Sequence, residues 1–150
     1  MEADLWQRKL AEGEELLDFS MELCALQMTA RPKRAFVFEH PQSASSWQRP
    51  SVQNILAQPG VRVAHFDECR FGLTSKMSGM PMKKATTLMT NVDPVFNTFH
   101  NVRCLGDHIH QPIRGNEGGI KRSEHAACYP VPMVNALVRA VCMHVGKQMD

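Results

Sequence analysis

The sequence predicts a single α/β domain in which helices flank a sheet. Two short runs of mostly apolar residues, 35–38 and 61–66, are too brief for helices and are predicted to be strands. A strand that is apolar throughout is typical of a parallel sheet covered on both faces. A short helical segment lies between the two runs, which gives the order of a βαβ unit with a right-handed crossover. A chain of 150 residues is long enough to bury one core.

A long amphipathic helix is predicted for Glu2–Thr29. Apolar residues recur at steps of three and four and form one stripe: Trp6, Leu10, Gly13, Leu17, Met21, Cys24 and Met28. Acidic residues occupy the other faces, so we expect the stripe to cover the sheet. The helix should end before Pro32, because the residue preceding a proline avoids helical geometry.

The first strand is followed by Glu39, His40 and Pro41. Ligands of open α/β sheets bind beyond the carboxyl ends of the strands, which makes Glu39 a candidate functional residue. The alternative is that Glu39 and His40 only open a solvated loop. The second strand is followed by Asp67, Glu68, Cys69 and Arg70, and we expect both acidic clusters at one edge of the sheet, around a shared cleft.

The remaining elements are predicted from the spacing of apolar residues and from the residues that start or end helices and strands. A short helix is predicted for 51–58 after Pro50, a third strand for 84–90, and a helix from Asp93 to about Val102. A closing helix over 131–148 is predicted to bury Val134, Leu137, Val138, Val141 and Val145. The segment 104–129 has no periodic pattern, and a loop of that length in a compact domain is usually functional or disordered.

This irregular segment contains five side chains that can bind a soft or borderline metal: Cys104, His108, His110, His125 and Cys128. Zinc takes four such ligands in a tetrahedron, and the sequence predicts Cys104, His108, His110 and Cys128, with His125 as an alternative. The spacing matches no standard zinc finger. The other interpretation is a mobile loop that places its histidines and Arg114 over the cleft.

Composition excludes several classes of protein. The net charge of +2 does not indicate a nucleic-acid-binding protein, and no apolar run approaches the roughly 20 residues that span a bilayer. The N-terminus does not resemble a signal peptide. Five cysteines, an odd number with scattered spacing, favour reduced thiols and an intracellular protein, cytoplasmic or nuclear. No P-loop, GxGxxG or nucleophile elbow is present.

Four blocks of sequence, taken in order, resemble one family. They are 39–47, 66–73, 83–91 and 104–115, and the match spans Leu5 to Val141. The chain is similar to the cytosine-5 DNA methyltransferase-like domains of mobile-element polyproteins and some phage proteins. The resemblance implies a Rossmann-like, methyltransferase-type sheet with flanking helices.

The resemblance also implies roles for particular residues. Glu39, in Glu39-His40-Pro41, resembles the catalytic glutamate that hydrogen-bonds the Watson–Crick edge of a flipped cytosine. A carboxyl group in a desolvated pocket can share a proton with the ring nitrogen. The expected nucleic-acid contacts are Trp47, Lys83, Lys84 and Thr87, although the family has an arginine where this chain has Thr87.

The chain departs from the family in what precedes Glu39. It has neither the glycine-rich loop that binds S-adenosylmethionine nor the Pro-Cys pair that carries the nucleophile. The resemblance therefore covers only the C-terminal half of a methyltransferase-like domain, expected to be inactive alone and to use S-adenosylmethionine only if a partner completes it. The alternatives are a non-enzymatic interaction module held by zinc, or a half-sheet that dimerises through its free edge.

Overall fold

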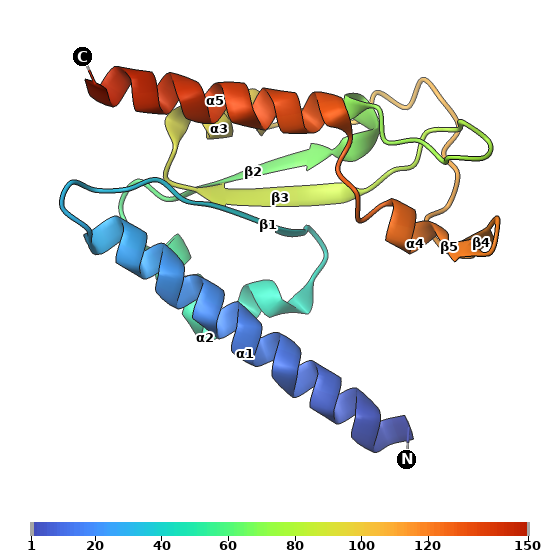
Figure 1. The fold of residues 1–150 in the computed structure, drawn as a ribbon, viewed down its shortest axis with the longest axis horizontal. Helices are drawn as coiled ribbons and strands as arrows, with labels where there is room; N and C mark the ends of the chain where they lie inside the picture. The colour runs from blue at the N-terminus through green and yellow to red at the C-terminus, as the bar shows by residue number, and fades with distance from the viewer. Residues whose placement is uncertain (1, 150) are drawn as a thin grey trace.

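The computed structural model describes residues 2–149 as a mixed α and β structure (Figure 1). In chain order its elements are α1 (Glu2–Thr29), β1 (Val37–Pro41), the 3-10 helix η1 (Ser45–Gln48), α2 (Pro50–Leu56), β2 (Arg62–Asp67), the 3-10 helix η2 (Glu68–Phe71), β3 (Ala85–Thr90), α3 (Asp93–Phe99), β4 (Asn116–Glu117), β5 (Ile120–Lys121), α4 (Arg122–His125) and α5 (Val131–Met149). The predicted helices and strands are therefore present, with ends shifted by a few residues.

The main sheet is antiparallel, so the predicted parallel sheet is wrong. Its three strands lie in the order β1-β3-β2, and β3 pairs antiparallel with each neighbour. β1 and β2 consequently run in the same direction, but β3 separates them. A strand that is apolar throughout indicates only that both faces of the sheet are buried. Helices cover both faces here, although the strands are antiparallel. The direction depends on how the long segment after η2 returns the chain to β3, which periodicity does not encode.

The expectation that both acidic clusters lie at one end of the sheet is consistent with the strand register. Pro41 at the end of β1 and Phe66 near the end of β2 both pair with Thr86. The carboxyl ends of the two strands are therefore level, at the end of the sheet where β3 begins.

Helices cover both faces of this sheet (Figure 1). On one face, α3 and α5 pack on a cluster that includes Phe66, Leu88 and Phe99. On the other face, α1 and α2 pack on a cluster that includes Phe36 and Met89. Alternate residues of each strand enter the two clusters, as the period of a strand requires.

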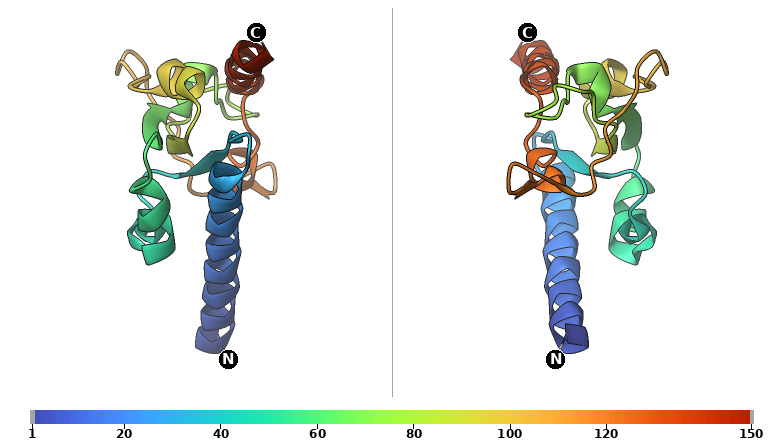
Figure 2. Two further views of the ribbon diagram at one scale, coloured as in Figure 1. Left: turned by 90° about the vertical axis from the view of Figure 1, so that its left-hand side faces the viewer. Right: turned by 90° about the vertical axis from the view of Figure 1, so that its right-hand side faces the viewer.

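Helix α1 has the predicted bounds, but only its C-terminal half covers the sheet. Leu17, Met21 and Cys24 are buried, whereas Trp6 is 67% exposed and Leu10 is 49% exposed. A helix of 28 residues is about 42 Å long, and a strand of six residues spans about 20 Å. The N-terminal half therefore extends past the sheet, as Figure 2 shows.

The predicted buried face of α5 is only partly right. Leu137 and Val141 are partly buried against the core, but the fully buried residues are Met133 and Ala140. The residues predicted as buried but exposed are Val134 (41%), Val138 (53%) and Val145 (46%). Adjacent residues are about 100° apart on a helix, so the true stripe is rotated from the valines by one position.

The long irregular segment contains little regular structure. Between Cys104 and Tyr129 it forms only the two-residue strands β4 and β5 and the short helix α4. Helix α3 ends at Phe99 rather than at the predicted Val102. Among the described helices, none combines the length and the apolar character needed to cross a membrane.

Candidate metal centre and polar groove

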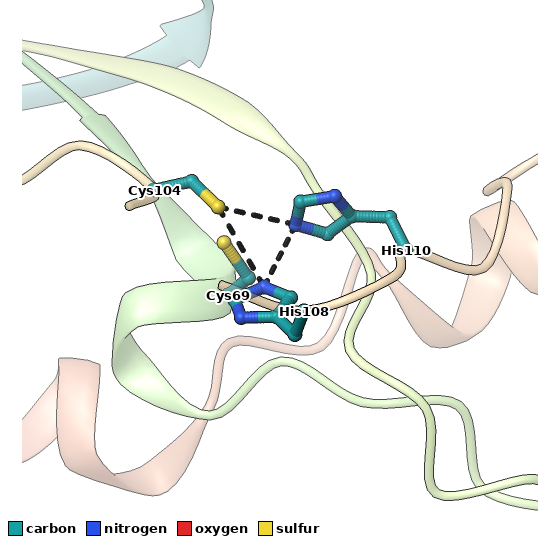
Figure 3. Close-up of side chains that lie close together, drawn as sticks. All are labelled: Cys69, Cys104, His108 and His110. Carbon is teal, nitrogen blue, oxygen red and sulfur yellow. Dashed lines mark hydrogen bonds between the residues drawn. The ribbon is translucent and has the colours of Figure 1, made fainter. Parts of the chain in front are cut away.

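Four metal-binding side chains meet beside the end of β2 (Figure 3). Cys69 lies in η2, directly after β2, and Cys104 lies in the loop that follows α3. His108 and His110 come from the same loop and point toward the two sulfur atoms. One ligand atom from each residue lies within 4.8 Å of all the others, and all four residues are half-buried. The group could therefore hold a metal ion.

The distances between these atoms are close to those of a tetrahedral zinc site. Cys104 Sγ lies 3.6 Å from His108 Nε2 and 3.4 Å from His110 Nε2, and the two Nε2 atoms are 2.9 Å apart. Ordinary zinc bond lengths at tetrahedral angles give about 3.6 Å for sulfur to nitrogen and about 3.3 Å for nitrogen to nitrogen. Three of the four candidate ligand atoms therefore have spacings close to those of a zinc site, and Cys69 Sγ lies within 4.8 Å of each of them.

Neighbouring groups orient the ligands. His108 Nδ1 lies 2.8 Å from Asp107 Oδ1, and an N–H at that position donates to the carboxylate and turns the Nε2 lone pair toward the group. The backbone N–H of Gly106 donates to Cys104 Sγ at 3.4 Å. The backbone N–H of Cys104 donates to Asp67 Oδ2 at 2.9 Å, which fixes the loop to the end of β2. Such partners are usual around metal ligands in proteins.

The surroundings of Cys69 disfavour its free thiolate. Burial raises the pKa of Cys69 to about 11, and a hydrogen bond and charge from Cys104 and the charge of Asp67 act in the same direction. The nearby ammonium of Lys83 lowers it only in part. Without a metal, the Cys69 thiol therefore stays protonated at neutral pH, and a bound cation would replace that proton.

The group in the structure differs from the predicted ligand set at one position. The structure brings together Cys104, His108 and His110, as the sequence predicts, but Cys128 is exposed and lies outside the group. Cys69 takes its place. The signal for Cys69 was its position immediately after a strand, at the end of the sheet to which the irregular segment returns. Ligand spacing alone could not identify it, because the pairing of β2 with that segment is tertiary.

Comparison with known proteins does not identify the chain. No family model, no curated protein and no solved structure matches it. The candidate function therefore rests on the geometry of the described residues.

A polar groove begins at the metal-binding group. Its first part is a cavity of about 570 Å³ lined by Gln42, Ser43, Asp67, Lys83, Ala85, Arg103 and Cys104. Its second part, about 320 Å³, shares Gln42 and Ser43 and continues past Trp47, His65 and Thr87. Arg103 donates to Gln42 Oε1 at 2.8 Å and lies 3.8 Å from Asp67 Oδ1. The groove is thus lined by two cationic side chains, Lys83 and Arg103, at one end and by the indole of Trp47 at the other.

Several predicted site residues lie along this groove or beside it. Lys83 lines the first part, and Trp47 and Thr87 line the second. The Trp47 Nε1–H donates to the backbone oxygen of Pro41 at 2.8 Å. His40 stacks on Phe38 and lies 2.6 Å from the Ser46 hydroxyl. Burial lowers the pKa of His40, against the opposing charge of Glu39.

The other two predicted residues lie on the opposite face of the sheet. Glu39 Oε2 accepts a hydrogen bond from the Tyr129 hydroxyl at 2.6 Å. Lys84 lies over the Tyr129 ring and 3.0 Å from the carboxylate of Glu68, which is fully buried. Thr86 Oγ1 also donates to Glu68, at 2.8 Å. Lys84 is therefore held in the interior, and the predicted residues do not form one continuous surface.

Proposed function

We propose that the chain is a non-enzymatic interaction module whose loop after α3 is held to the sheet by a structural zinc ion. The observation that carries this proposal is the convergence of Cys69, Cys104, His108 and His110 within 4.8 Å. Two thiolates and two imidazoles are a ligand set that zinc takes readily, at distances close to those described above. Four protein ligands leave no open position for substrate, so the ion would be structural.

The zinc would join two segments that are distant in sequence. Cys69 belongs to η2, and the other three ligands belong to the 100–110 segment. The backbone hydrogen bond from Asp67 to Val102, at 3.0 Å, already links these segments. A metal bound there would convert a weakly held loop into a fixed wall of the polar groove.

Metal analysis of the purified chain tests this proposal. We expect one zinc ion per chain by mass spectrometry of the metal, and cobalt substitution should give the absorption of a tetrahedral site with two thiolates. A chain prepared in zinc-containing medium that carries no zinc, and does not take up cobalt, would contradict the proposal.

A second candidate function is contact with a single strand of nucleic acid, as the methyltransferase resemblance implies. The polar groove supports it, because Lys83 and Arg103 can neutralise phosphates while Trp47 offers a surface for base stacking. On this hypothesis the chain is the substrate-contacting half of a methyltransferase-like domain. S-adenosylmethionine would bind only in a partner that completes the domain. Glu39 lies on the opposite face of the sheet, where it accepts the Tyr129 hydroxyl, so this groove does not account for the catalytic role that the resemblance implies for it.

Salt dependence tests the second candidate. With a labelled single-stranded oligonucleotide, two phosphate contacts predict a slope of about −1.4 for log K against log salt. Lys83→Ala and Arg103→Ala should each reduce the slope by about 0.7, while Arg8→Ala on the exposed surface of α1 should not change it. S-adenosylmethionine should give no heat of binding with the chain alone. Equal binding by all three variants would contradict this function.

A further inference from the structure

The two edge strands of the main sheet, β1 and β2, differ in whether other backbone groups cover them. Beyond β2, the backbone N–H of Asn101 donates to His65 at 3.1 Å, and that of Asp67 donates to Val102 at 3.0 Å, so a loop covers this edge. Beyond β1, no other strand of residues 2–149 pairs with it, and the backbone N–H of Ala44 donates only to the oxygen of its last residue, Pro41, at 3.2 Å. The sheet therefore has one free edge, and it is β1.

The register identifies which backbone groups face outward. The N–H of Gln42 donates to the backbone oxygen of Ala85 on β3 at 3.1 Å. Every second residue of an antiparallel strand directs its N–H and C=O to the same neighbour, so the backbone groups of His40 and Phe38 also face β3. The N–H and C=O groups of Val37 and Glu39 alternate with them and face away from the sheet. Pro41 has no N–H and ends the edge. An exposed row of this kind is a template for another strand.

An apolar groove runs beside this edge. A cavity of about 360 Å³ lies between β1 and α5, with Glu39 at its margin, and its apolar walls are Val37, Phe38, Leu88, Tyr129, Met133, Val134 and Leu137. Val134 is 41% exposed and Tyr129 is 44% exposed, although both stand next to the core. Side chains on one face of an added strand would enter this groove and cover them.

Glu39 gives the groove a charge preference. Its Oε2 accepts the Tyr129 hydroxyl, but its Oε1 is buried and has no hydrogen-bond partner among the described residues. Tyr129 always donates in this pair, because burial and the charges of Glu39 and Glu68 hold its pKa far above neutrality. A buried carboxylate oxygen without a donor is uncommon in native proteins, and a cationic side chain on a strand added at this edge would supply one.

We propose that the β1 edge binds an extended strand of another protein by β-augmentation, with apolar side chains in the groove and a lysine or arginine paired with Glu39. Backbone hydrogen bonds to Val37 and Glu39 would supply affinity, and the alternate side chains would supply specificity. This binding mode needs neither zinc nor nucleic acid, so it stands apart from the functions proposed above.

A second copy of this chain fits the edge less well. In a symmetric antiparallel pair, Val37 and Glu39 of one copy would face Glu39 and Val37 of the other. The strand Val37–Pro41 contains no lysine or arginine, so it would offer no cation to Glu39, and the Glu39 Oε1 atoms would remain unpaired. The charge of the edge therefore favours a different, basic strand.

Nuclear magnetic resonance of the 150-residue, zinc-supplemented chain tests this proposal with the peptide acetyl-Val-Thr-Arg-Thr-Val-amide. Millimolar peptide should shift the amides of Val37 and Glu39 and the methyl groups of Val134 and Leu137. Replacing the peptide's arginine with glutamate should weaken binding at least tenfold, and N-methylation of its edge-facing amides should abolish it.

Matched variants separate binding at the edge from other effects. Val134→Asp should abolish the shifts, whereas Val145→Asp, on the same helix outside the groove, should leave them unchanged. The proposal is overturned if Val37 and Glu39 do not shift, or if the three peptides bind equally. Concentration-dependent shifts of the same amides without peptide would assign the edge to a second copy and would also overturn it.

Discussion

At the scale of single residues, Cys69 is the position that changes the interpretation of the chain. Its thiol lies in a pocket formed with Cys104, His108 and His110, and its pKa is raised by burial. Cys128 has the same chemistry but is exposed to solvent. The difference between the two cysteines lies entirely in their surroundings, and it can be measured.

Cys69→Ser should reduce zinc affinity by at least about 100-fold, because one of four direct ligands is lost. Cys128→Ser is the matched control and should keep one zinc per chain. Competition with a chromophoric chelator measures both affinities. Loss of zinc in Cys128→Ser with retention in Cys69→Ser would restore the ligand set predicted from sequence.

A second residue-scale prediction concerns the buried pair of Lys84 and Glu68, whose polar atoms are 3.0 Å apart. Lys84→Met would leave the carboxylate buried without its cation, at a cost of about 3 kcal/mol at neutral pH. Burial raises the pKa of Glu68 even with Lys84 and Thr86 opposing it. A raised folded-state pKa means that stability is highest below the unfolded pKa and falls as pH rises through the folded pKa.

Because Lys84 lowers the pKa of Glu68, its removal should raise that pKa further, and the deficit of Lys84→Met should shrink as pH falls. Urea unfolding at pH 5 and pH 8 measures this, with wild type at each pH to cancel the effect of zinc loss. The double variant Glu68→Gln, Lys84→Met serves as the control and should show a deficit that does not change with pH. A deficit for Lys84→Met that is equal at both pH values would contradict the assignment of the cost to Glu68.

At the scale of elements, α1 is one continuous helix with two different environments. Its C-terminal half contributes Leu17, Met21 and Cys24 to the core, and its N-terminal half extends past the sheet (Figure 2). The periodicity of apolar residues continues through both halves, so sequence alone does not divide them. The strands are shorter than the helix, and their length determines how much of α1 can pack on the sheet.

Met21→Ala should therefore cost about 3 kcal/mol of unfolding free energy, as is usual for truncation of a buried methionine. Trp6→Ala should change stability by less than about 0.5 kcal/mol, because that side chain is 67% exposed. Urea denaturation of both variants measures these changes in the free energy of unfolding. Comparable losses would show that the N-terminal half of α1 is also packed in solution.

At the scale of the whole molecule, the main sheet has only three strands, and the 100–110 segment lies across the outer edge of β2 with few backbone hydrogen bonds. A metal that binds only the folded chain stabilises it by mass action, by about 4 kcal/mol at a thousandfold excess over its dissociation constant. The effect should be greatest where the ligands lie.

Removal of zinc with a chelator should therefore increase amide hydrogen exchange in η2 and in the 100–110 segment, while β3 and α5 remain protected. Hydrogen-exchange mass spectrometry of the zinc-loaded and chelated chain measures this. Uniform deprotection would mean that the metal supports the whole fold, and no change would mean that the segment is held without it.

The sequence by itself determined the four longer helices and three strands that it predicted, because they are marked by the period of their apolar residues and by prolines, and these signals are local. It also predicted three of the four residues of the candidate metal site, since His108 and His110 alternate along one short loop close to Cys104. It placed the carboxyl ends of β1 and β2 at one end of the sheet, because the order strand, helix, strand makes the two strands run in the same direction.

Only the tertiary structure decided the direction of β3, the stripe of α5 that is buried, and the choice of Cys69 over Cys128. Each depends on contacts between segments that are far apart in sequence, as when the segment after α3 returns to the end of β2. The free edge of β1 was likewise decided only by the tertiary structure. A strand becomes an edge only because β3 pairs with its other side, and that pairing is a property of the assembled sheet.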